Sequence, residues 1–294
     1  MNSDRSQLAA LGGLVVAALL FGVTFVVVKS AIETVDPLAF VGWRFLIGGG
    51  ALLILATPTS HGVWRDGMIA GLWLFAGYAL QTNGLTVTGA TNSALITGLY
   101  VVFVPLIAAI ARRRAPSPWA VVGVVLGFIG TSLLTVREDL TFGTGDLLTV
   151  GCALAFACHV VTISRQAPRH PVIPYTAVQL LTTAVLGLVG SVVFEGPGLP
   201  DRNGWPAIIV TGLGVSAVAY VLQVWAQNRV GPSRTAILLT LEPVFAVAAA
   251  ALVLSERLTT AGWFGALVIF GAISLVLAKV EDDPILEAEA ISPV

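Results

Sequence analysis

The chain has 294 residues, of which 56% are hydrophobic and 11% are charged. Soluble globular domains carry about 25% charged residues, so this composition excludes an ordinary soluble protein and favours an integral membrane protein. The formal net charge of −1 gives no indication of a strongly acidic or basic partner.

Apolar segments recur along the whole chain, each of about 20 residues, the length that a helix needs to cross ~30 Å of hydrocarbon. They predict ten membrane-spanning helices with short connections and no soluble domain between them. The first segment could be mistaken for a signal peptide, but it lacks a small-x-small cleavage site before Lys29, which favours a retained helix. The predicted spans are 8–28, 37–56, 66–86, 91–111, 118–136, 145–164, 173–194, 204–227, 233–254 and 260–278.

The sequence repeats itself at an offset of 142 residues, without a gap from about residue 77 to residue 136. At an offset of 135, residues 18–21 also match residues 153–156, so the opening helices of the two halves correspond as well. The matching pairs include Tyr78/Tyr220, Gln81/Gln223, Ala94/Ala236, Phe103/Phe245 and Gly123/Gly265.

The repeat divides the chain into two related halves of five spans each, at residues 8–136 and 145–278. Because each half crosses the membrane an odd number of times, the second half enters from the opposite side, and the repeats are inverted. Repeats of this kind are characteristic of secondary transporters, whose binding site lies where the repeats meet. The predicted fold is therefore an all-α membrane protein of ten transmembrane helices in two inverted five-helix repeats.

The basic residues predict the orientation in the membrane. They are concentrated in the loops on the side of the N-terminus, which the positive-inside rule assigns to the cytoplasm. We therefore expect a multi-pass protein of the plasma membrane, in a bacterium the inner membrane, with both termini cytoplasmic. Residues 1–7 form the cytoplasmic N-terminus in this scheme, and residues 279–294 form an acidic disordered tail. Arg112-Arg113-Arg114 is interpreted as the flank of a span rather than as a contact with nucleic acid.

Motifs of soluble enzymes are absent or lack their structural context. Gly212-x-Gly214-x-x-Ala217 has the spacing of a dinucleotide fingerprint, but it lies within a predicted span and follows no strand. Cys152 and Cys158 lie six residues apart on one predicted helix, too far apart to form a disulfide with each other. We predict no catalytic residue, no cofactor and no metal ligand. The expected partners are a small-molecule substrate and the lipid bilayer, not nucleic acid, and a homodimer is left open.

Polar side chains within the spans mark the candidate site, because each is energetically unfavourable in hydrocarbon. Ser93, Thr97 and Tyr100 recur at i, i+4 and i+7 and so share one face of the fourth predicted span. Several polar positions in the two halves are related by the repeat offsets. The residues expected to converge on a substrate cavity near the membrane midplane are Thr24, Tyr78, Gln81, Ser93, Thr97, Tyr100, His159, Tyr220, Gln223, Gln227, Thr235 and Glu242.

Glu242 lies near the centre of the ninth predicted span and is followed by Pro243. Because a proline removes a helical hydrogen bond, helix breaks are predicted at Pro243 and, in the fourth span, at Pro105. One interpretation makes Glu242 a proton-coupling or cation-binding group, since loss of water favours the neutral form of a carboxyl. The alternative is a hydrogen-bonded structural carboxyl that holds the kink.

Arg44 and His159 each allow two interpretations. For Arg44 we favour an extension to the membrane interface beside Trp43, or a pair with Glu33 or Asp36, over a contact with substrate. For His159 a buried, neutral and hydrogen-bonded ring is favoured over a proton shuttle.

The order and spacing of several motifs resemble those of the drug/metabolite transporter superfamily, in its EamA-type branch of duplicated ten-span carriers. The resemblance covers roughly residues 10–278. The chain departs from it at Phe21, where many members have tryptophan, and at Arg113-Arg114, where many have an acidic residue. The motifs are Phe21-Gly22 with Lys29, Asp36-Pro37 before Trp43-Arg44-Phe45, Thr91-Asn92-Ser93-Ala94 to Pro105, Glu242-Pro243-Val244-Phe245 and Ser255-Glu256-Arg257-Leu258-Thr259.

This resemblance implies a carrier, often an exporter of amino acids or other small metabolites, with spans one, three, four, six, eight and nine around a central cavity. The predicted function is alternating-access transport of a small organic metabolite such as an amino acid or a drug-like solute, with proton coupling as a hypothesis. One alternative is a non-transporting scaffold or sensor subunit. The other, an intramembrane enzyme, is disfavoured because the ionisable groups in the spans form no recognisable catalytic motif.

Overall fold

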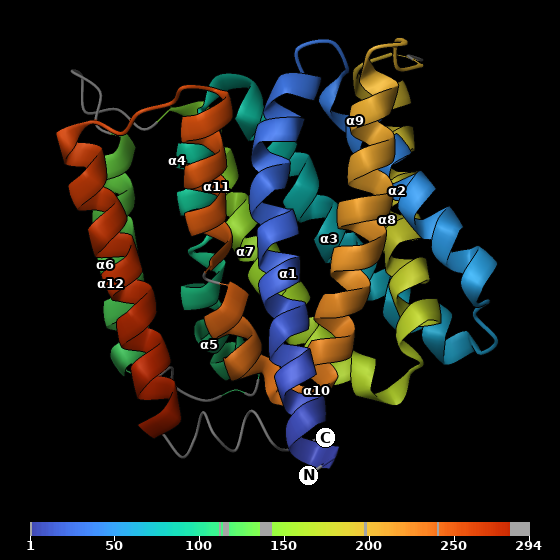
Figure 1. The fold of residues 1–294 in the computed structure, drawn as a ribbon, viewed down its shortest axis with the longest axis horizontal. Coiled ribbons are helices and arrows are strands. Elements are labelled where there is room, and N and C mark those ends of the chain that lie inside the picture. The colour runs from blue at the N-terminus through green and yellow to red at the C-terminus, as the bar shows by residue number, and fades with distance from the viewer. Residues whose placement is uncertain are drawn as a thin grey trace.

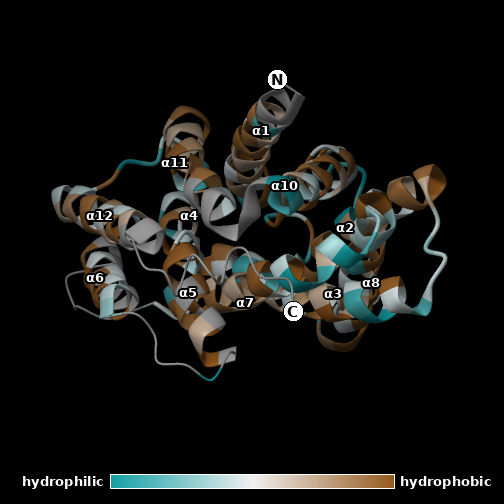
Figure 2. Ribbon diagram, turned by 90° about the horizontal axis from the view of Figure 1, so that it is seen from below, coloured by the Kyte–Doolittle hydropathy of each residue, from teal (hydrophilic) through white to brown (hydrophobic). Residues whose placement is uncertain are grey.

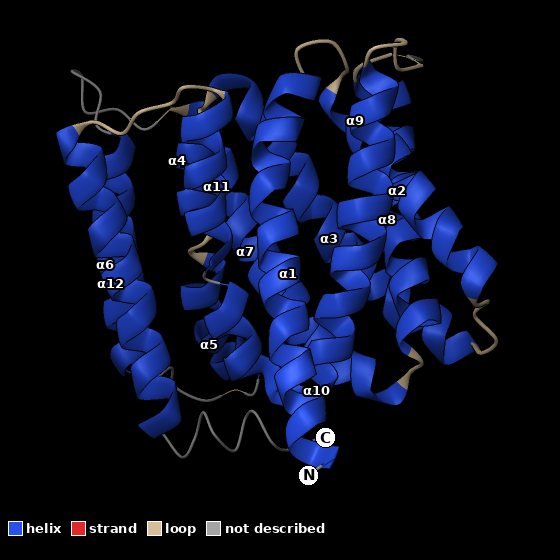
Figure 3. Ribbon diagram, in the orientation of Figure 1, coloured by secondary structure: helices blue, strands red, loops and turns tan. Residues whose placement is uncertain are grey.

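The fold was determined from a computed structural model that describes residues 2–111, 113, 118–135, 143–196, 199–239 and 241–282. Within these ranges every regular element is a helix and no strand is present, as Figure 3 shows. The predicted tail beyond residue 282, together with Arg112 and Arg114, lies outside the described residues. We call the side on which α1 begins, at the bottom of Figure 1, the lower side of the molecule.

The described helices follow the predicted order of spans. In the first half they are α1 (Asn2–Ala31), α2 (Pro37–Leu55), α3 (His61–Val87), α4 (Ala90–Thr97), α5 (Tyr100–Ala111) and α6 (Pro118–Thr135). In the second half they are α7 (Thr144–Gln166), a 3-10 turn (Ala167–Arg169), α8 (Val172–Phe194), α9 (Gly204–Val210), a π-helical segment (Thr211–Ala219), α10 (Tyr220–Leu239), α11 (Leu241–Val253) and α12 (Thr260–Asp282).

Five of the described helices are long and apolar enough to cross a membrane: Gln7–Ala31, Pro37–Leu55, Thr144–Arg169, Val172–Phe194 and Gly204–Arg229. Figure 2 shows hydrophobic residues over much of the helical surface, while hydrophilic residues gather at helix ends and in loops. Exposed side chains such as Leu72, Val185 and Phe264 suit contact with lipid. The predicted all-α membrane fold is confirmed by this arrangement, while the count of ten spans stays a prediction.

The two halves of the chain are packed into each other. α1 of the first half packs against α10 and α11 of the second, α2 against α8, α3 against α7, and α6 against α12. In Figure 1, α6 and α12 stand at one edge of the molecule, α2 and α8 lie towards the other, and α1 is central. The boundary between the repeats therefore passes through the middle of the molecule, where the site is expected.

Glycines allow the helices of the two halves to approach closely. A Cβ atom built on Gly42 of α2 would lie 2.7 Å from the backbone nitrogen of Leu188, and one built on Gly187 of α8 would lie 2.8 Å from the Cα atom of Gly42. No side chain fits at such distances. This is the way in which helices associate in membranes, where van der Waals packing of small residues replaces the hydrophobic effect.

The fourth predicted span is interrupted, but not at its proline. α4 and α5 are separated by a turn at Gly98–Leu99, in which the Leu99 N–H donates to the carbonyl of Ile96 at 3.1 Å. Since α5 continues through residue 105, the break predicted at Pro105 is wrong. A Cβ atom on Gly98 would lie 2.8 Å from Cγ of Pro243. The proline that packs on this turn is therefore the one of the other half.

The ninth predicted span comprises the end of α10 and all of α11, and Thr240 between them lies outside the described residues. α11 begins at Leu241, which corresponds to Leu99 at the 142-residue offset. Glu242 and Pro243 lie in the first turn of α11, and the break at Pro243 stays a prediction. Tyr100 and Glu242 correspond at the 142-residue offset, and they lie in the first turns of α5 and α11.

Candidate substrate pocket

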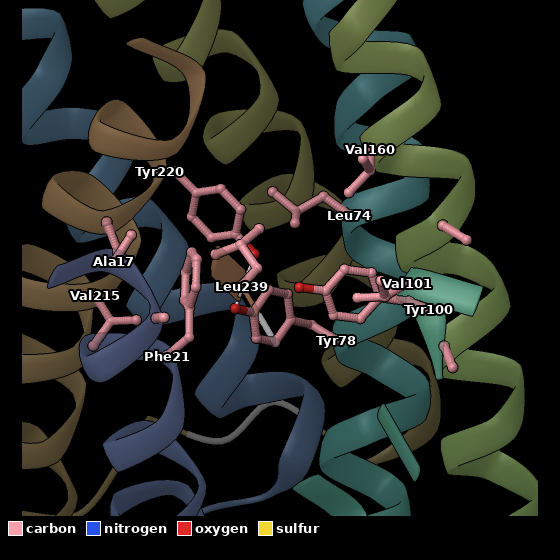
Figure 4. Packing of buried hydrophobic residues seen from close by; sticks show 14 of the residues in the cluster. Ala17, Phe21, Leu74, Tyr78, Tyr100, Val101, Val160, Val215, Tyr220 and Leu239 are labelled. Carbon is pink, nitrogen blue, oxygen red and sulfur yellow. Dashed lines mark hydrogen bonds between the residues drawn. The ribbon is translucent and has the colours of Figure 1, made fainter. Parts of the chain in front are cut away.

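A pocket lies between the two halves of the chain. Its wall is formed by α1, α3, α5, α7, α10 and α11, which correspond to predicted spans one, three, four, six, eight and nine. Figure 4 shows Phe21, Tyr78, Tyr100, Tyr220 and Leu239 converging on this region from different helices. The lining residues are Phe21, Thr24, Phe25, Tyr78, Gln81, Tyr100, Phe156, His159, Val160, Tyr220, Gln223, Leu239 and Glu242.

Most of the polar residues selected from the sequence lie in this wall. They are Thr24, Tyr78, Gln81, Tyr100, His159, Tyr220, Gln223 and Glu242. The others are buried but lie outside the lining, namely Ser93, Thr97, Gln227 and Thr235. The structure thus brings eight of the twelve predicted residues to one pocket.

Two of the residues behind the wall hold other side chains in position. Thr97 accepts a hydrogen bond at 3.3 Å from Nε2 of Gln81, which lines the pocket. Gln227 donates to Oγ of Ser164 at 2.6 Å and to the carbonyl of Val160 at 3.3 Å, and so ties α10 to α7. These contacts fix the depth at which Gln81 and Val160 meet the pocket.

The selection of polar positions missed the apolar part of the wall. Phe21 and Phe156 both line the pocket, and their rings lie 5.0 Å from that of Tyr220 and 5.2 Å from that of Tyr78, respectively. A signal for both was present, because Phe21 and Phe156 correspond at the 135-residue offset. Residues that correspond in two inverted repeats can meet at the centre whether or not they are polar.

Tyr78 and Tyr220 form the central contact between the repeats. Their hydroxyl oxygens are 2.9 Å apart, with Tyr220 donating to Tyr78, and their rings meet edge to face with centroids 6.4 Å apart. Because the two residues correspond in the repeat, a direct bond between them indicates that the pseudo-twofold axis passes close by. The pocket is therefore built at the axis that relates the two halves.

Arg44 lies in the interior, with only 1% of its surface exposed. Its Nε atom donates to Oγ of Ser216 at 2.9 Å, and its Nη2 atom approaches the hydroxyl of Tyr78 at 3.5 Å. Neither Glu33 nor Asp36 pairs with it in the part of the chain that the structure describes. The favoured interpretation of Arg44 as an interfacial residue is therefore wrong.

The two ionisable residues in the wall differ in their contacts. Glu242 is 8% exposed and borders the pocket, and its carboxyl has no hydrogen bond or ion pair to any described residue. His159 is 2% exposed, and its Nε2 atom lies 2.8 Å from Oε1 of Gln179. His159 thus has the hydrogen-bonded environment that was favoured for it, whereas Glu242 has a free carboxyl at the pocket. No cluster of three or more possible metal ligands occurs among the described residues.

Comparison with known proteins gives the family. The EamA-like transporter family matches the chain twice, over residues 8–136 and 143–278. An uncharacterized transporter of Archaeoglobus fulgidus is 32% identical over 268 residues, covering 91% of this chain and 85% of that protein. The aromatic amino acid exporter YddG of Ancylobacter novellus is 26% identical over 219 residues, covering 69% of this chain and 74% of its own.

A solved crystal structure shares the fold, with a TM-score of 0.68 and 21% identity over 93% of this chain and 98% of the other. The family match includes both halves of the chain and agrees with the duplicated helical fold around a central pocket. The chain belongs to the EamA-like transporter family, in the drug/metabolite transporter superfamily, and is a multi-pass membrane transporter.

Proposed function

We propose that this transporter exports a small organic metabolite, with an amino acid as the best candidate, by alternating access. The observation that carries the proposal is the pocket at the axis between the repeats, where Tyr78 and Tyr220 meet. A site at such an axis can be exposed to either side when the two halves exchange conformations.

The wall of the pocket supports an amino acid as cargo. The rings of Phe21, Phe25 and Phe156 provide an apolar face, while Gln81, Gln223 and Glu242 provide polar groups. An apolar wall with a few converging polar groups suits a molecule that has a hydrophobic side chain and a charged end. The similarity to an aromatic amino acid exporter agrees with this choice.

We infer that the lower side of the molecule faces the cytoplasm. The reason is the positive-inside rule, since Arg65 near the start of α3 and Arg113 after α5 lie on that side, and Arg202 lies on the other. Single cysteines in place of Arg113 and Arg202 should react with impermeant reagents from opposite sides of the membrane. Labelling of both from the same side contradicts this orientation.

The proposed function is tested with the purified full chain in sealed proteoliposomes. A panel of labelled amino acids, nucleosides and cationic drugs is offered for counterflow, and we expect counterflow of at least one amino acid. The direction of transport is tested in cells, where overexpression should protect growth against toxic amino-acid analogues. If no solute of the panel shows counterflow, the scaffold alternative is favoured and the proposal is wrong.

Proton coupling is proposed to pass through Glu242. A desolvated carboxyl without a fixed partner can exchange a proton, and substrate and proton can compete for it as the halves move. Glu242→Gln keeps the shape of the side chain and removes titration, so it should abolish accumulation driven by a pH gradient and leave counterflow measurable. Tyr100→Phe, at the corresponding position, should change substrate affinity only. Unchanged pH dependence in Glu242→Gln assigns the carboxyl a structural role.

A further inference from the structure

We propose that Arg44 acts through the hydroxyl pair of Tyr78 and Tyr220 to select a substrate that carries a carboxylate. The inference rests on the proposed function and narrows its cargo to zwitterions of the α-amino acid type. Arg44 does not border the pocket, so its role is one of positioning and polarising the two tyrosines that do.

Arg44 is a buried cation without a counter-ion among the described residues. Arginine stays protonated in proteins, and a buried unpaired charge is strongly unfavourable. Its guanidinium carbon lies 5.1 Å from the ring centre of Phe45 and 4.8 Å from that of Tyr78, and these ring faces compensate part of the charge. Tyr78 contacts this guanidinium and also lines the pocket, so part of the positive field extends into the pocket.

The environment of Arg44 has no equivalent in the other half of the chain. Ser216, which accepts from Nε of Arg44, lies in the π-helical segment, whereas residues 69–77 at the corresponding place in α3 are regular α-helix. A Cβ atom on Gly212 would lie 2.8 Å from the carbonyl oxygen of Arg44, and one on Gly71 would lie 2.7 Å from that of Gln179. Arg44 and Gln179 thus occupy matching positions, and only the first half places a charge there. Deviations to π-helix are frequent at functional sites.

The hydroxyl pair has one hydrogen left for a ligand. Arg44 can only donate, and Tyr78 is its acceptor. One of the two tyrosine hydrogens lies between Tyr78 and Tyr220, and the other has no acceptor among the described residues. Both tyrosines line the pocket. The pair therefore presents a hydrogen-bond donor beside a fixed positive charge, and a carboxylate oxygen is the acceptor that such a donor favours.

A partner for a positive group of the ligand is provided by Glu242, which has a free carboxyl and lines the same pocket. A ligand with a carboxylate and an ammonium group on the same carbon atom can face the tyrosine pair with one and Glu242 with the other. An amine without a carboxylate leaves the donor unmatched, and an acid without an amine leaves Glu242 unmatched. Each unmatched buried group lowers affinity.

The test compares ligands that differ only at the carboxylate. In proteoliposomes of the full chain, counterflow of labelled L-phenylalanine and L-leucine is inhibited with the unlabelled amino acid or with its carboxamide. A lost hydrogen bond between a polar site and a charged ligand group weakens binding by about tenfold to a hundredfold. We expect each acid to inhibit at a concentration lower than its amide by that factor. This ratio is measured on the unmodified protein and does not depend on any variant.

Three variants locate the effect. Tyr78→Phe and Arg44→Gln should bring the acid-to-amide ratio close to one, while Arg44→Lys, which keeps the charge, should retain part of it. Thr183→Val is the matched control, since Thr183 is a buried hydroxyl in the corresponding contact of α8 with α3, where it donates to the carbonyl of Gly71 at 3.2 Å. In this control any change in affinity should be equal for acid and amide.

The outcomes separate this inference from the function on which it rests. Counterflow of amino acids with a ratio near one in the unmodified protein overturns carboxylate selection and leaves the transport proposal standing. A high ratio that persists in Tyr78→Phe and Arg44→Gln assigns the recognition to other residues and also overturns the inference. Absence of counterflow for every amino acid overturns the proposed function itself.

Discussion

Replacement of Glu256 by glutamine should loosen the upper end of the molecule without unfolding it. Glu256 lies in the connection between α11 and α12, and its two carboxylate oxygens accept hydrogen bonds from the backbone nitrogens of Ala90 at 2.9 Å and Thr91 at 2.8 Å. These are the first residues of α4, whose N-terminus carries a partial positive charge. A side chain of the second half thus caps a helix of the first, in the connection that follows α11 at the upper end of the molecule in Figure 1.

The size of the effect follows from the two bonds. Hydrogen bonds to a charged group contribute about 1.5–3 kcal/mol each, and those between neutral groups about 0.5–1.5 kcal/mol. Glutamine retains one acceptor oxygen and loses the charge, and Glu256 is only half-buried, so solvent screens part of the loss. We expect the contact between the halves to weaken by about 1–2 kcal/mol, which changes a conformational equilibrium roughly 5- to 30-fold.

The assay measures access to the pocket from the upper side. A single cysteine replaces Thr24, which lines the pocket, in a protein whose Cys152 and Cys158 have been changed to alanine. The rate of labelling by a membrane-impermeant maleimide is then measured in vesicles of each orientation. Glu256→Gln should raise the rate from the upper side by roughly 5- to 30-fold, with no increase from the lower side.

Glu195→Gln is the matched control. Glu195 caps the start of α2 in the same way, accepting from the nitrogens of Leu38 at 2.7 Å and Ala39 at 3.0 Å. However, α2 also packs along α8 through the glycine contacts at Gly42, so the loss of this cap should not separate the two helices. Equal labelling in the two variants, or no change in Glu256→Gln, refutes the idea that the Glu256 cap holds the upper end closed.

Three further changes test individual contacts. Lys29→Met removes two hydrogen bonds, of 2.6 and 2.9 Å, to carbonyl groups at the end of α3. It should destabilise the protein by about 1–3 kcal/mol and so lower the Tm in detergent. An unchanged Tm shows that the bonds are not formed. Ser255 has a φ of 56°, so Ser255→Gly should raise the Tm by relieving about 0.5–1 kcal/mol of backbone strain, and a fall contradicts this. Gly77 lies against the ring of Phe156, so Gly77→Ala should push that ring into the pocket. The KM for counterflow should rise clearly while the Tm changes little. A large fall in Tm with an unchanged KM shows that the substitution affects packing alone.

The repeat made the centre of this molecule predictable. Hydropathy locates the helices because a segment that crosses the membrane must form its backbone hydrogen bonds within itself and must carry apolar side chains along its length. The offset of 142 residues then pairs positions of the two halves, and Tyr78 and Tyr220 do meet at 2.9 Å. Tyr100 and Glu242, which also correspond, lie in the first turns of α5 and α11. A residue and its copy occupy equivalent environments in two inverted repeats, so those near the axis face each other.

The features that escaped prediction depend on contacts between the halves. The break in the fourth span lies at Gly98, where the ring of Pro243 packs, and nothing near Pro105 in the sequence indicates this. Arg44 has an acidic residue eight positions before it, at Asp36, which favours an interfacial pair in the sequence alone. The inward orientation of Arg44 depends on a hydrogen bond to Ser216, which lies in a π-helical segment. No known spacing of residues predicts such a segment from the sequence.

The differences between the two copies are as informative as their likeness. A symmetrical pocket at a twofold axis offers the same groups to both ends of a ligand, and an α-amino acid has different ends. The chain breaks the symmetry at three corresponding pairs, Thr24 and His159, Arg44 and Gln179, and Tyr100 and Glu242. The cation lies in the first half and the carboxyl in the second. A zwitterion bound between them contacts both halves, so its binding energy depends on how the halves are arranged, which is the condition for a ligand to bias a conformational equilibrium.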